Sequence, residues 1–531
     1  SPGSLTTSTG TATATAAAPP ATAVVPPAAR GGTAVLTRPV QPSRALGPPM
    51  VPPGPPAWMG VPLARRAGGW VVLGAIGVGV LGDLTLRAEV AGVITAVAIA
   101  ATAALLLVSG LLVTRQSRVL VALAPVFGVW MAVRESDWLV PLDLIAAAGL
   151  LLLGTSLARG GSVADLPFAG LMSRAWHAFL HGCAAPELLV RAVPDAPRLR
   201  SARAVAVLRG ALLAAPVLIL LGVLLVSGDA VFASFFDVDL DLDVADVIGH
   251  VFLTGLATWV CLWLLRVAGA EPPEPLPRVS ARLGAVEATV VLGSVVALFG
   301  AFAVSQAVAV IGGDDYVRRT TGLTYAEYAR SGFFQLLWVA ALTVATLLLL
   351  RACVARDAAP RRFAVLFGAV CALTLLIVAV AIRRLGLYQE TFGLTMLRLY
   401  CTLFAVWIGV VLVLLAAWLV RPWARAWFPA AAAGAGLALL LGLNVVNPEA
   451  LVAATNLQRE AALRTDTGYV AELSEDAIPT IVELLPTLDE EERAALVRRI
   501  CRGTARDDDR SWMTWTLSHS RTEAARAEAC G

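Results

Sequence analysis

The sequence predicts an all-α membrane protein: a polytopic transmembrane helix bundle of about 11 spans, followed by a C-terminal extracytoplasmic helical region. The chain of 531 residues is 58% hydrophobic and only 15% charged, whereas a water-soluble domain is about 45–50% apolar and about 25% charged. The apolar residues are gathered in long blocks, which is the pattern of a chain that crosses a bilayer repeatedly. The lipid bilayer is therefore the first predicted partner.

Composition divides the chain into three parts. Residues 1–68 form a tail rich in Pro, Ala and Thr, which buries too little apolar surface to offset its ordering entropy and is predicted to be disordered. We do not interpret it as a signal peptide, because no charged segment is followed by an apolar one and a cleavage site. Residues 69–446 hold the transmembrane bundle, and residues 447–531 form a polar, soluble helical region.

A span needs about 20 apolar residues to cross roughly 30 Å of hydrocarbon. The segments expected to cross are 69–86, 90–113, 119–133, 138–157, 207–227, 246–267, 285–311, 331–351, 362–382, 396–420 and 428–446. The weakest is 119–133, because it is short and carries Pro125 in the middle. The arginines on either side of it could snorkel to the two surfaces and complete the crossing.

The arginines between the spans predict an orientation. If the N-terminus is inside and the loops alternate, most of the arginines in the loops fall on the inside, as the positive-inside rule requires. We therefore expect a multi-pass protein of the cytoplasmic membrane, with its N-terminus inside and its C-terminus outside. One span more or fewer in the middle of the chain would remove this asymmetry.

Motifs of several functional classes are absent from the sequence. The formal net charge is +3 and no dense basic tract occurs, so no nucleic-acid partner is expected. There is no P-loop, no G-x-G-x-x-G after a strand and no G-x-S-x-G, which argues against an ATP-driven pump. No catalytic residue and no cofactor are predicted.

Two patterns resemble metal sites but are incomplete. His177 and His181 are four residues apart in a predicted surface helix, FAGLMSRAWHAFLHG, without the glutamate of an H-E-x-x-H motif. The alternating aspartates of DVDLDLDVAD lack the glycine and the final glutamate of an EF-hand calcium loop. We therefore predict no metal site, and we interpret the aspartates as a solvated acidic rim.

Two spans are expected to begin with a capping threonine. In GLTYAEYAR, Thr324 and Glu327 form a capping box, in which each side chain accepts a hydrogen bond from the amide of the other residue. In GLTMLRLY, Thr395 occupies the cap position and Arg398 replaces the glutamate. A helix start at a water boundary explains both motifs, because the first amide groups of a membrane helix need partners.

The same residues also allow a functional interpretation. Glu327 and Arg398 have opposite charges at matching depth, and they could pair across neighbouring helices. Four further polar side chains fall in the outer part of the spans: Asp83, Asp143, His250 and Gln306. Ionisable groups inside a membrane usually face a cavity or one another, so we hypothesise an outer polar cluster that forms a vestibule. The alternative is that each residue simply lies near an interface.

The C-terminal region is expected to form short amphipathic helices. Asn447 is a typical N-cap before Pro448 at the first helical position. Ser474 is a second cap, and the acidic residues after it suit the positive end of a helix. Cys501 and Cys530 both fall in this region. In an extracytoplasmic setting they could form a disulfide; two unpaired thiols are the alternative.

Four motifs occur in a fixed order: FAVSQAVAVIGGDDYVRRTTGLTYAEYARSGFFQL, ETFGLTMLRLY, NVVNPEALVAATNLQRE and YVAELSEDAIP. They resemble the bacterial polytopic membrane family known as domain of unknown function 4173, which is related to domain of unknown function 4153. The resemblance covers roughly residues 70–531 and implies a many-span bundle with a helical tail in a bacterial cytoplasmic membrane. It implies no substrate, reaction, cofactor or functional residue.

Two functions follow as hypotheses. The first is a secondary transporter or permease for a small solute, with the outer polar cluster as its entry. The alternative is a membrane-anchored sensor or scaffold, which acts through its extracytoplasmic helical tail and a protein partner. Spans with paired Gly/Pro breaks and an inverted repeat, which many secondary transporters have, are not evident. A membrane enzyme ranks last, because no catalytic motif is found.

Overall fold

The structure is a computed structural model that describes residues 63–88, 90–192, 244–272, 283–321, 332–354, 360–420, 427–459, 467–502 and 511–531, with a few single positions between 207 and 225. These residues form helices and connecting turns, and the described part of the chain contains no β-strand. The predicted all-α class is therefore confirmed. Of the predicted N-terminal tail, residues 1–68, only residues 63–68 are described. The predicted span 207–227 lies almost wholly outside the described residues.

Eight of the described helices are long and apolar enough to cross a membrane. They are α1 (Gly69–Arg87), α4 (Leu139–Ser156), α9 (Val244–Gly269), α10 (Ala285–Thr321), α12 (Phe333–Cys353), α13 (Pro360–Phe392), α14 (Met396–Val420) and α15 (Phe428–Val446). Each corresponds to one of the predicted spans. The protein is therefore a membrane protein with several apolar helices that suit contact with a bilayer.

Two further predicted spans form helices that are short for a crossing: α2 (Val93–Val108) is shorter than the predicted segment 90–113, and α3 (Arg115–Trp130) is about as long as the predicted segment 119–133. Both helices have 16 residues, fewer than the roughly 20 that a straight crossing needs. The chain after α2 turns at Gly110, whose φ of +70° is a left-handed conformation that favours glycine. An apolar segment that looks continuous in the sequence is divided there into a helix and an extended connection.

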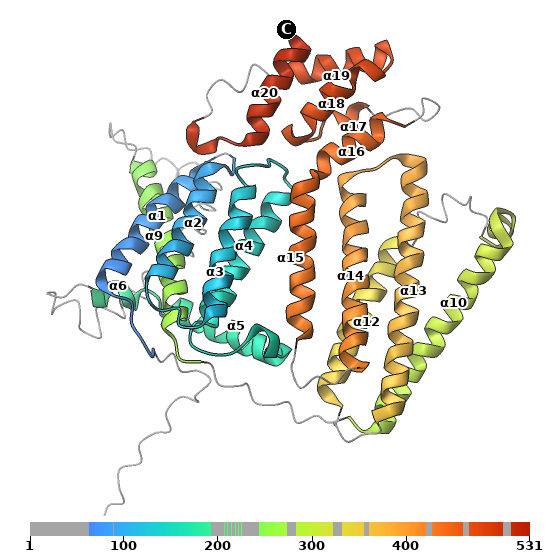
Figure 1. Ribbon diagram of the computed structural model, residues 1–531, viewed down its shortest axis with the longest axis horizontal. Helices are drawn as coiled ribbons and strands as arrows, with labels where there is room; N and C mark the ends of the chain where they lie inside the picture. The colour runs from blue at the N-terminus through green and yellow to red at the C-terminus, as the bar shows by residue number, and fades with distance from the viewer. Residues whose placement is uncertain are drawn as a thin grey trace, which may run out of the picture. The chain divides into compact units, whose positions relative to one another are not determined.

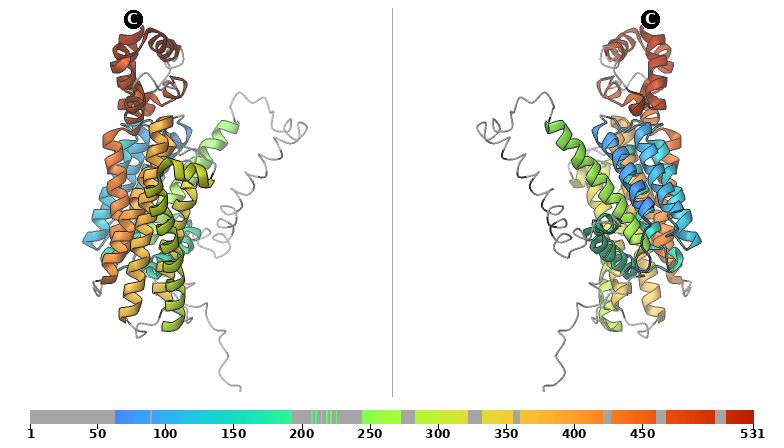
Figure 2. Two further views of the ribbon diagram at one scale, coloured as in Figure 1. Left: turned by 90° about the vertical axis from the view of Figure 1, so that its right-hand side faces the viewer. Right: turned by 90° about the vertical axis from the view of Figure 1, so that its left-hand side faces the viewer.

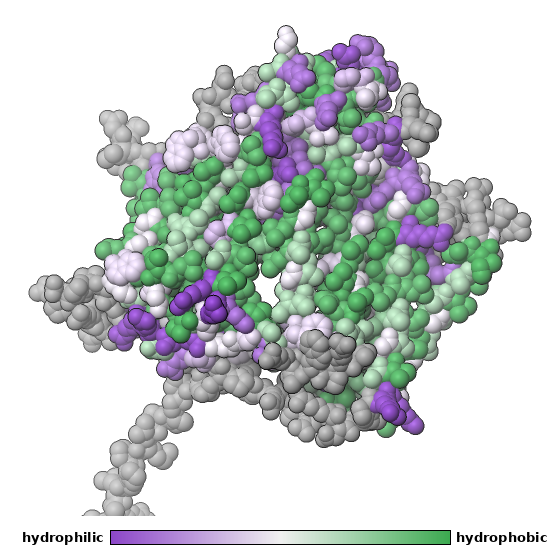
Figure 3. Space-filling model, viewed as in Figure 1, coloured by the Kyte–Doolittle hydropathy of each residue, from purple (hydrophilic) through white to green (hydrophobic). Residues whose placement is uncertain are grey.

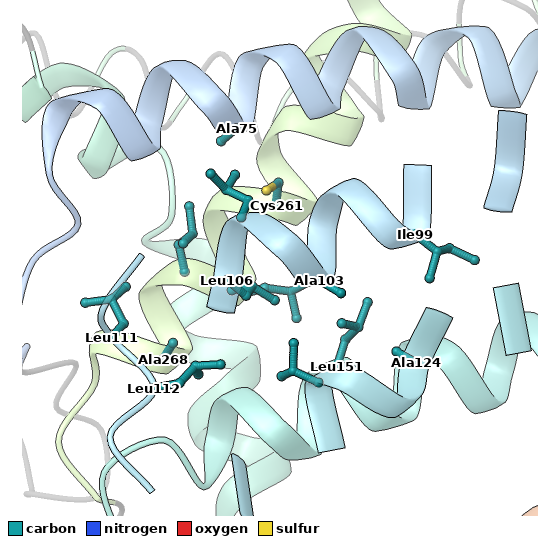
Figure 4. Close-up of a cluster of buried hydrophobic side chains, with 14 of the residues drawn as sticks. Ala75, Ile99, Ala103, Leu106, Leu111, Leu112, Ala124, Leu151, Cys261 and Ala268 are labelled. Carbon is teal, nitrogen blue, oxygen red and sulfur yellow. The ribbon is translucent and has the colours of Figure 1, made fainter. Parts of the chain in front are cut away.

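The helices pack around separate hydrophobic cores (Figure 1). One core lies among α1, α2, α3, α4 and α9, and Figure 4 shows part of it, including Ala75, Leu106 and Cys261. Another lies among α10, α12, α13 and α14. Helix α15 contributes Leu440 to the first and Phe428 to the second. The last span therefore joins the two groups of helices.

Helices α1 and α9 approach each other closely through small residues. A Cβ atom on Gly79 would lie only 1.9 Å from the Thr258 hydroxyl oxygen and 2.8 Å from the Thr254 carbonyl oxygen. A Cβ atom on Gly82 would lie 2.3 Å from that of Ala257. Small residues at helix contacts let the two backbones approach, which is how membrane helices gain packing energy without a hydrophobic driving force.

The flank of the bundle is rich in large apolar side chains. On the face shown in Figure 3, hydrophobic residues cover most of the described surface between the two ends of the spans. Leu73, Trp338 and Val365 are 70%, 67% and 70% exposed. Such a surface is a liability in water and is suited to lipid.

The C-terminal helices lie together at one end of the bundle, here called the tail end (Figures 1 and 2). They are α16 (Pro448–Leu457), α17 (Thr467–Val470), η3 (Glu475–Ala477), α18 (Ile478–Leu484), η4 (Leu485–Thr487), α19 (Glu490–Arg502), η6 (Trp512–Thr514) and α20 (Leu517–Cys530). They share an apolar core that includes Val470, Ile481 and Leu496. A disulfide between Cys501 and Cys530 links the ends of α19 and α20.

Three short helices connect α4 to the chain beyond it: η2 (Val163–Asp165), α5 (Phe168–Cys183) and α6 (Glu187–Ala192). Helix α5 is the predicted surface helix. It lies across the spans at the end of the bundle opposite the tail end, here called the α5 end (Figure 1). The indole Nε1 atoms of Trp259 and Trp263 in α9 donate to the carbonyl oxygens of Gly182 and Ala178 at 2.9 and 2.6 Å, which fixes α5 on the first core.

Candidate functional site

Two members of the predicted outer polar cluster meet between α1 and α9. Asp83 Oδ2 lies 2.5 Å from His250 Nδ1. Arg87 Nε donates to Asp83 Oδ1 at 3.3 Å, and the same guanidinium bonds the side chain of Asp246. Opposite charges thus neutralise one another at one end of the helix pair. Arg87 and Asp246 belong to this group as well, although they are not members of the predicted cluster.

The other described members of the predicted cluster have neighbours on different helices. Asp143 Oδ1 in α4 accepts a hydrogen bond from Asn444 Nδ2 in α15 at 2.8 Å, and both side chains are buried. Gln306 Oε1 in α10 accepts one from Arg384 Nη2 in α13 at 3.1 Å. The members of the predicted cluster are expected at a similar depth in the membrane, but Asp143 and Gln306 lie on different helix pairs and do not join Asp83 and His250.

Arg398 and Thr395 lie together at the start of α14. The Thr395 hydroxyl accepts a hydrogen bond from the Arg398 amide at 3.4 Å. The Arg398 guanidinium donates to the Phe392 carbonyl oxygen at 3.2 Å and lies 4.2 Å from the ring centre of Tyr388. The other predicted cap, Thr324, and its partner Glu327 lie outside the described residues, as do the aspartates at 237–243.

A group of buried polar contacts joins the bundle to the C-terminal helices. Arg134, just after α3, donates through Nε and Nη2 to the Asn444 carbonyl oxygen at 3.0 and 2.8 Å. Its Nη1 lies 3.7 Å from Asp476 Oδ1, and Asp476 Oδ2 accepts a hydrogen bond from the Glu135 amide at 3.0 Å. Burial lowers the pKa of Arg134 and raises that of Asp476. Both groups have therefore lost hydration to form this contact.

Helix α20 is held to the loop between α3 and α4, which also carries Arg134. The Leu517 amide donates to the Ala132 carbonyl oxygen at 2.8 Å, and the Thr516 hydroxyl donates to Glu135 Oε1 at 2.8 Å. The Thr516 oxygen also accepts the His519 amide at 3.1 Å and so caps α20. One threonine therefore starts the helix and attaches it to the bundle.

Glu475 and His519 connect η3 with α20. His519 Nδ1 lies 2.8 Å from Glu475 Oε2, and the His519 side chain is nearly buried. Arg526 Nη2 lies 3.5 Å from the other carboxylate oxygen of Glu475. The Thr522 hydroxyl donates to the Glu475 carbonyl oxygen at 2.8 Å. These contacts fix the direction in which the Glu475 carboxylate points.

An open cavity of about 410 Å³ lies beside these contacts. Its lining residues are Val90, Ala91, Glu135, Asp137, Val140, Pro141, Ser474 and Glu475. Three of these residues are acidic and none is basic, and they come from both the bundle and the C-terminal region. We call the cavity and its three acidic residues, together with His519, the tail-end site. Its wall is negative and therefore suits a cation.

Three side chains of the tail-end site form a set that could hold a metal ion. One ligand atom from each of Glu135, Glu475 and His519 lies within 4.8 Å of the other two. Two carboxylates and an imidazole are the donors of many zinc and manganese sites. The sequence predicts no metal site here, because Glu135 is separated from Glu475 and His519 by hundreds of positions and the three residues follow no spacing motif.

The histidine pair of the predicted surface helix lies at the α5 end. His177 and His181 are 8% and 2% exposed, so both imidazoles are buried. They line a cavity of about 20 Å³ together with Arg159 and Arg174. The Arg174 guanidinium donates to the carbonyl oxygens of Ser156 and Gly160. The two arginines make this environment unfavourable for a cation, so the cavity is poorly suited to a metal ion bound by the two histidines.

Acid is expected to destabilise the α5 end through His181. Burial lowers the pKa of His181 from 6.5 to about 4, with further repulsion from Arg266 and His177. The charged and titratable groups around it are Arg159, Arg174, His177, Arg266, Glu187 and Glu271. Since the folded pKa is depressed, the stabilisation is complete above about pH 6.5 and is lost as the pH falls towards 4.

Thermal unfolding of the wild type and His181→Gln in detergent between pH 7 and pH 4 checks this expectation. The wild type should lose up to about 3 kcal/mol more over this range than the variant, which has no imidazole to protonate. Parallel pH curves for the two proteins would contradict it.

The fold and the site define a polytopic helical membrane protein with a helical region attached at one end of its bundle. The chain belongs to the family described as domain of unknown function (DUF4153), whose sequence model matches residues 120–484. No curated protein and no solved structure matches the chain significantly. The matched range begins in α3 and ends with α18, so it includes Glu135 and Glu475 but not His519.

Proposed function

We propose that the protein is a membrane-anchored sensor that binds a divalent metal ion at the tail-end site. The observation that carries this proposal is the convergence of Glu135 from the bundle with Glu475 and His519 from the C-terminal region beside one cavity. An ion held there contacts both parts of the protein at once. Its binding therefore changes how firmly the C-terminal helices are attached, and a protein partner outside the cytoplasm reads that change.

The surroundings of the three ligands support this role. Thr516 orients Glu135 by donating to Oε1, and Arg526 lies against Glu475 Oε1. His519 Nε2 lies 3.3 Å from Glu523 Oε1, which can fix the imidazole ring while Nδ1 faces the ion. Side chains of this kind orient metal ligands from behind and raise their affinity. Zinc and manganese are the ions that best fit the mixed donor set.

A transport function has less support. The charged residues of the eight apolar helices lie towards the helix ends, and the central turns carry none. Secondary transporters usually bind substrate and coupling ion near the middle of the membrane, on polar or unwound helix segments. We also propose, from the sequence motifs, a closer relation to domain of unknown function 4173. This relation implies no function of its own and leaves the proposed function unchanged.

Metal-dependent stabilisation of the full chain tests the proposal. The protein is purified in detergent, treated with a chelator and unfolded thermally with and without Mn²⁺ or Zn²⁺. An ion at about 100 times its Kd should stabilise the wild type by about 2.7 kcal/mol. Glu475→Gln should lose most of this gain, because it removes a charged ligand and leaves the side-chain shape unchanged.

Glu528→Gln is the matched control, because Glu528 is exposed on α20 and is not one of the three ligands. It should keep the wild-type gain. If Glu475→Gln does not fold, Glu135→Gln on the bundle side takes its place. A wild type without any metal-dependent gain, or an equal gain in ligand and control variants, would overturn the proposal.

A further inference from the structure

Helix α5 has one apolar and one polar face. Its exposed large side chains are Phe168, Met172, Trp176 and Phe179, with exposed fractions of 63%, 46%, 38% and 58%. They recur at helical spacing and therefore lie along one face. The opposite face carries Ser173, His177 and His181, which are buried. A helix that lies across the spans and exposes aromatic residues is arranged like the interfacial helices that rest in the headgroup layer of a membrane.

The buried face of α5 closes the cavity of about 20 Å³ at the α5 end. Four basic side chains line it: Arg159, Arg174, His177 and His181. His181 is 2% exposed, and its Nδ1 makes no hydrogen bond to the described residues. Arg159 Nη1 is likewise buried without such a bond. Buried polar groups of this kind gain a great deal from an acceptor that enters the cavity.

We infer that this cavity binds the oxyanion of a phosphate group, delivered by a phospholipid headgroup or by free phosphate. Arginine is suited to phosphate because its planar guanidinium can donate two parallel hydrogen bonds to it. Glu271 is the one acidic residue among the lining residues, and it is exposed. Arg266 adds positive charge nearby but is paired with Glu187 at 3.0 Å. The site is thus predominantly basic.

The size of the cavity fits part of a phosphate group. A volume of about 20 Å³ accepts roughly one or two oxygen atoms, so the rest of the group stays at the mouth. The exposed aromatic face of α5 lies on the opposite side of the same helix, where contact with the headgroup layer would keep the cavity at the membrane surface. A bound negative charge would also relieve the repulsion that His181 receives from Arg266 and His177.

The test compares anionic and neutral surroundings for the full chain. The protein is reconstituted in phosphatidylcholine alone, in phosphatidylcholine with phosphatidylglycerol, and in phosphatidylcholine with inorganic phosphate at matched ionic strength. The thermal unfolding midpoint is measured in each. Phosphatidylglycerol should raise the wild-type midpoint, and the apparent affinity for it should be on the order of tenfold weaker in Arg159→Gln.

Arg66→Gln is the control, because Arg66 is exposed and outside the cavity lining. It belongs to the α5 end, since the amide of the preceding residue donates to the Gly269 carbonyl oxygen at 3.1 Å. A gain with phosphatidylglycerol alone supports a lipid source, and a gain with inorganic phosphate supports a soluble one, provided that Arg159→Gln loses it. No gain in the wild type, or the same gain in both variants, overturns the inference. If Arg159→Gln is unfolded in phosphatidylcholine, His181→Gln is judged by the same criteria.

Discussion

Leucine in place of Gly79 is expected to separate α1 from α9 and to destabilise the bundle by at least about 3 kcal/mol. The first atom of any side chain there would overlap the Thr258 hydroxyl and press on the Thr254 carbonyl oxygen. The carbonyl belongs to the backbone of α9, so the overlap can be relieved only by moving a whole helix. The measurement is the thermal midpoint in detergent, together with the yield of monodisperse protein by size exclusion.

Gly77→Leu is the matched control for this experiment. Gly77 lies in the same helix, but a Cβ atom there would have no neighbour within 4 Å. Both changes replace glycine by the same apolar, helix-favouring residue, so they differ only in what the new side chain meets. Gly77→Leu should leave the midpoint unchanged or raise it slightly. Equal midpoints for the two variants would show that α1 and α9 do not pack through Gly79.

Methionine in place of Arg134 should detach the C-terminal helices from the bundle. The change removes both hydrogen bonds to the Asn444 carbonyl oxygen and leaves the buried Asp476 carboxylate without its cation. Removing one partner of a buried ion pair typically costs about 3–5 kcal/mol. Limited proteolysis should therefore release the C-terminal region from the variant at protease levels that leave the wild type intact.

A double variant separates the loss of the pair from the loss of packing. Arg134→Met combined with Asp476→Leu leaves no unpaired buried charge, and it should recover part of the protection. Arg493→Met is the control for the substitution itself, because Arg493 is exposed on α19. Should the single Arg134→Met variant resist protease as the wild type does, the docking contact would not hold the C-terminal region.

Hydropathy made the eight long apolar helices predictable, because crossing a bilayer requires a long apolar helix whatever its neighbours are. It could not predict where α2 ends, since the turn at Gly110 depends on a backbone conformation and not on polarity. Helix caps could also be predicted from the sequence, because a cap depends on only a few adjacent residues. Asn447, for example, accepts the Ala450 amide at 3.2 Å as a local cap should.

The candidate site was harder to predict, because its members come from distant parts of the chain. Depth in the membrane can be estimated from the sequence, so Asp83, Asp143 and His250 were expected near one surface. Which helices are neighbours depends on packing, and only Asp83 and His250 proved to face each other. The sequence held one weak indication for each of two ligands: Glu135 follows a loop arginine, and His519 lies at the start of a helix. Nothing local indicated that they would meet.

The place of α15 in the chain has a consequence for biogenesis. It is the last of the eight apolar helices that the structure describes, yet it packs on helices that are synthesised long before it, and its Asn444 carbonyl oxygen is the acceptor for Arg134. The C-terminal helices can reach their seat only after this span has entered the membrane. Docking of the C-terminal helices on the bundle is therefore a sign that α15 has been inserted. A protease that removes undocked C-terminal regions would discard chains in which α15 failed to insert.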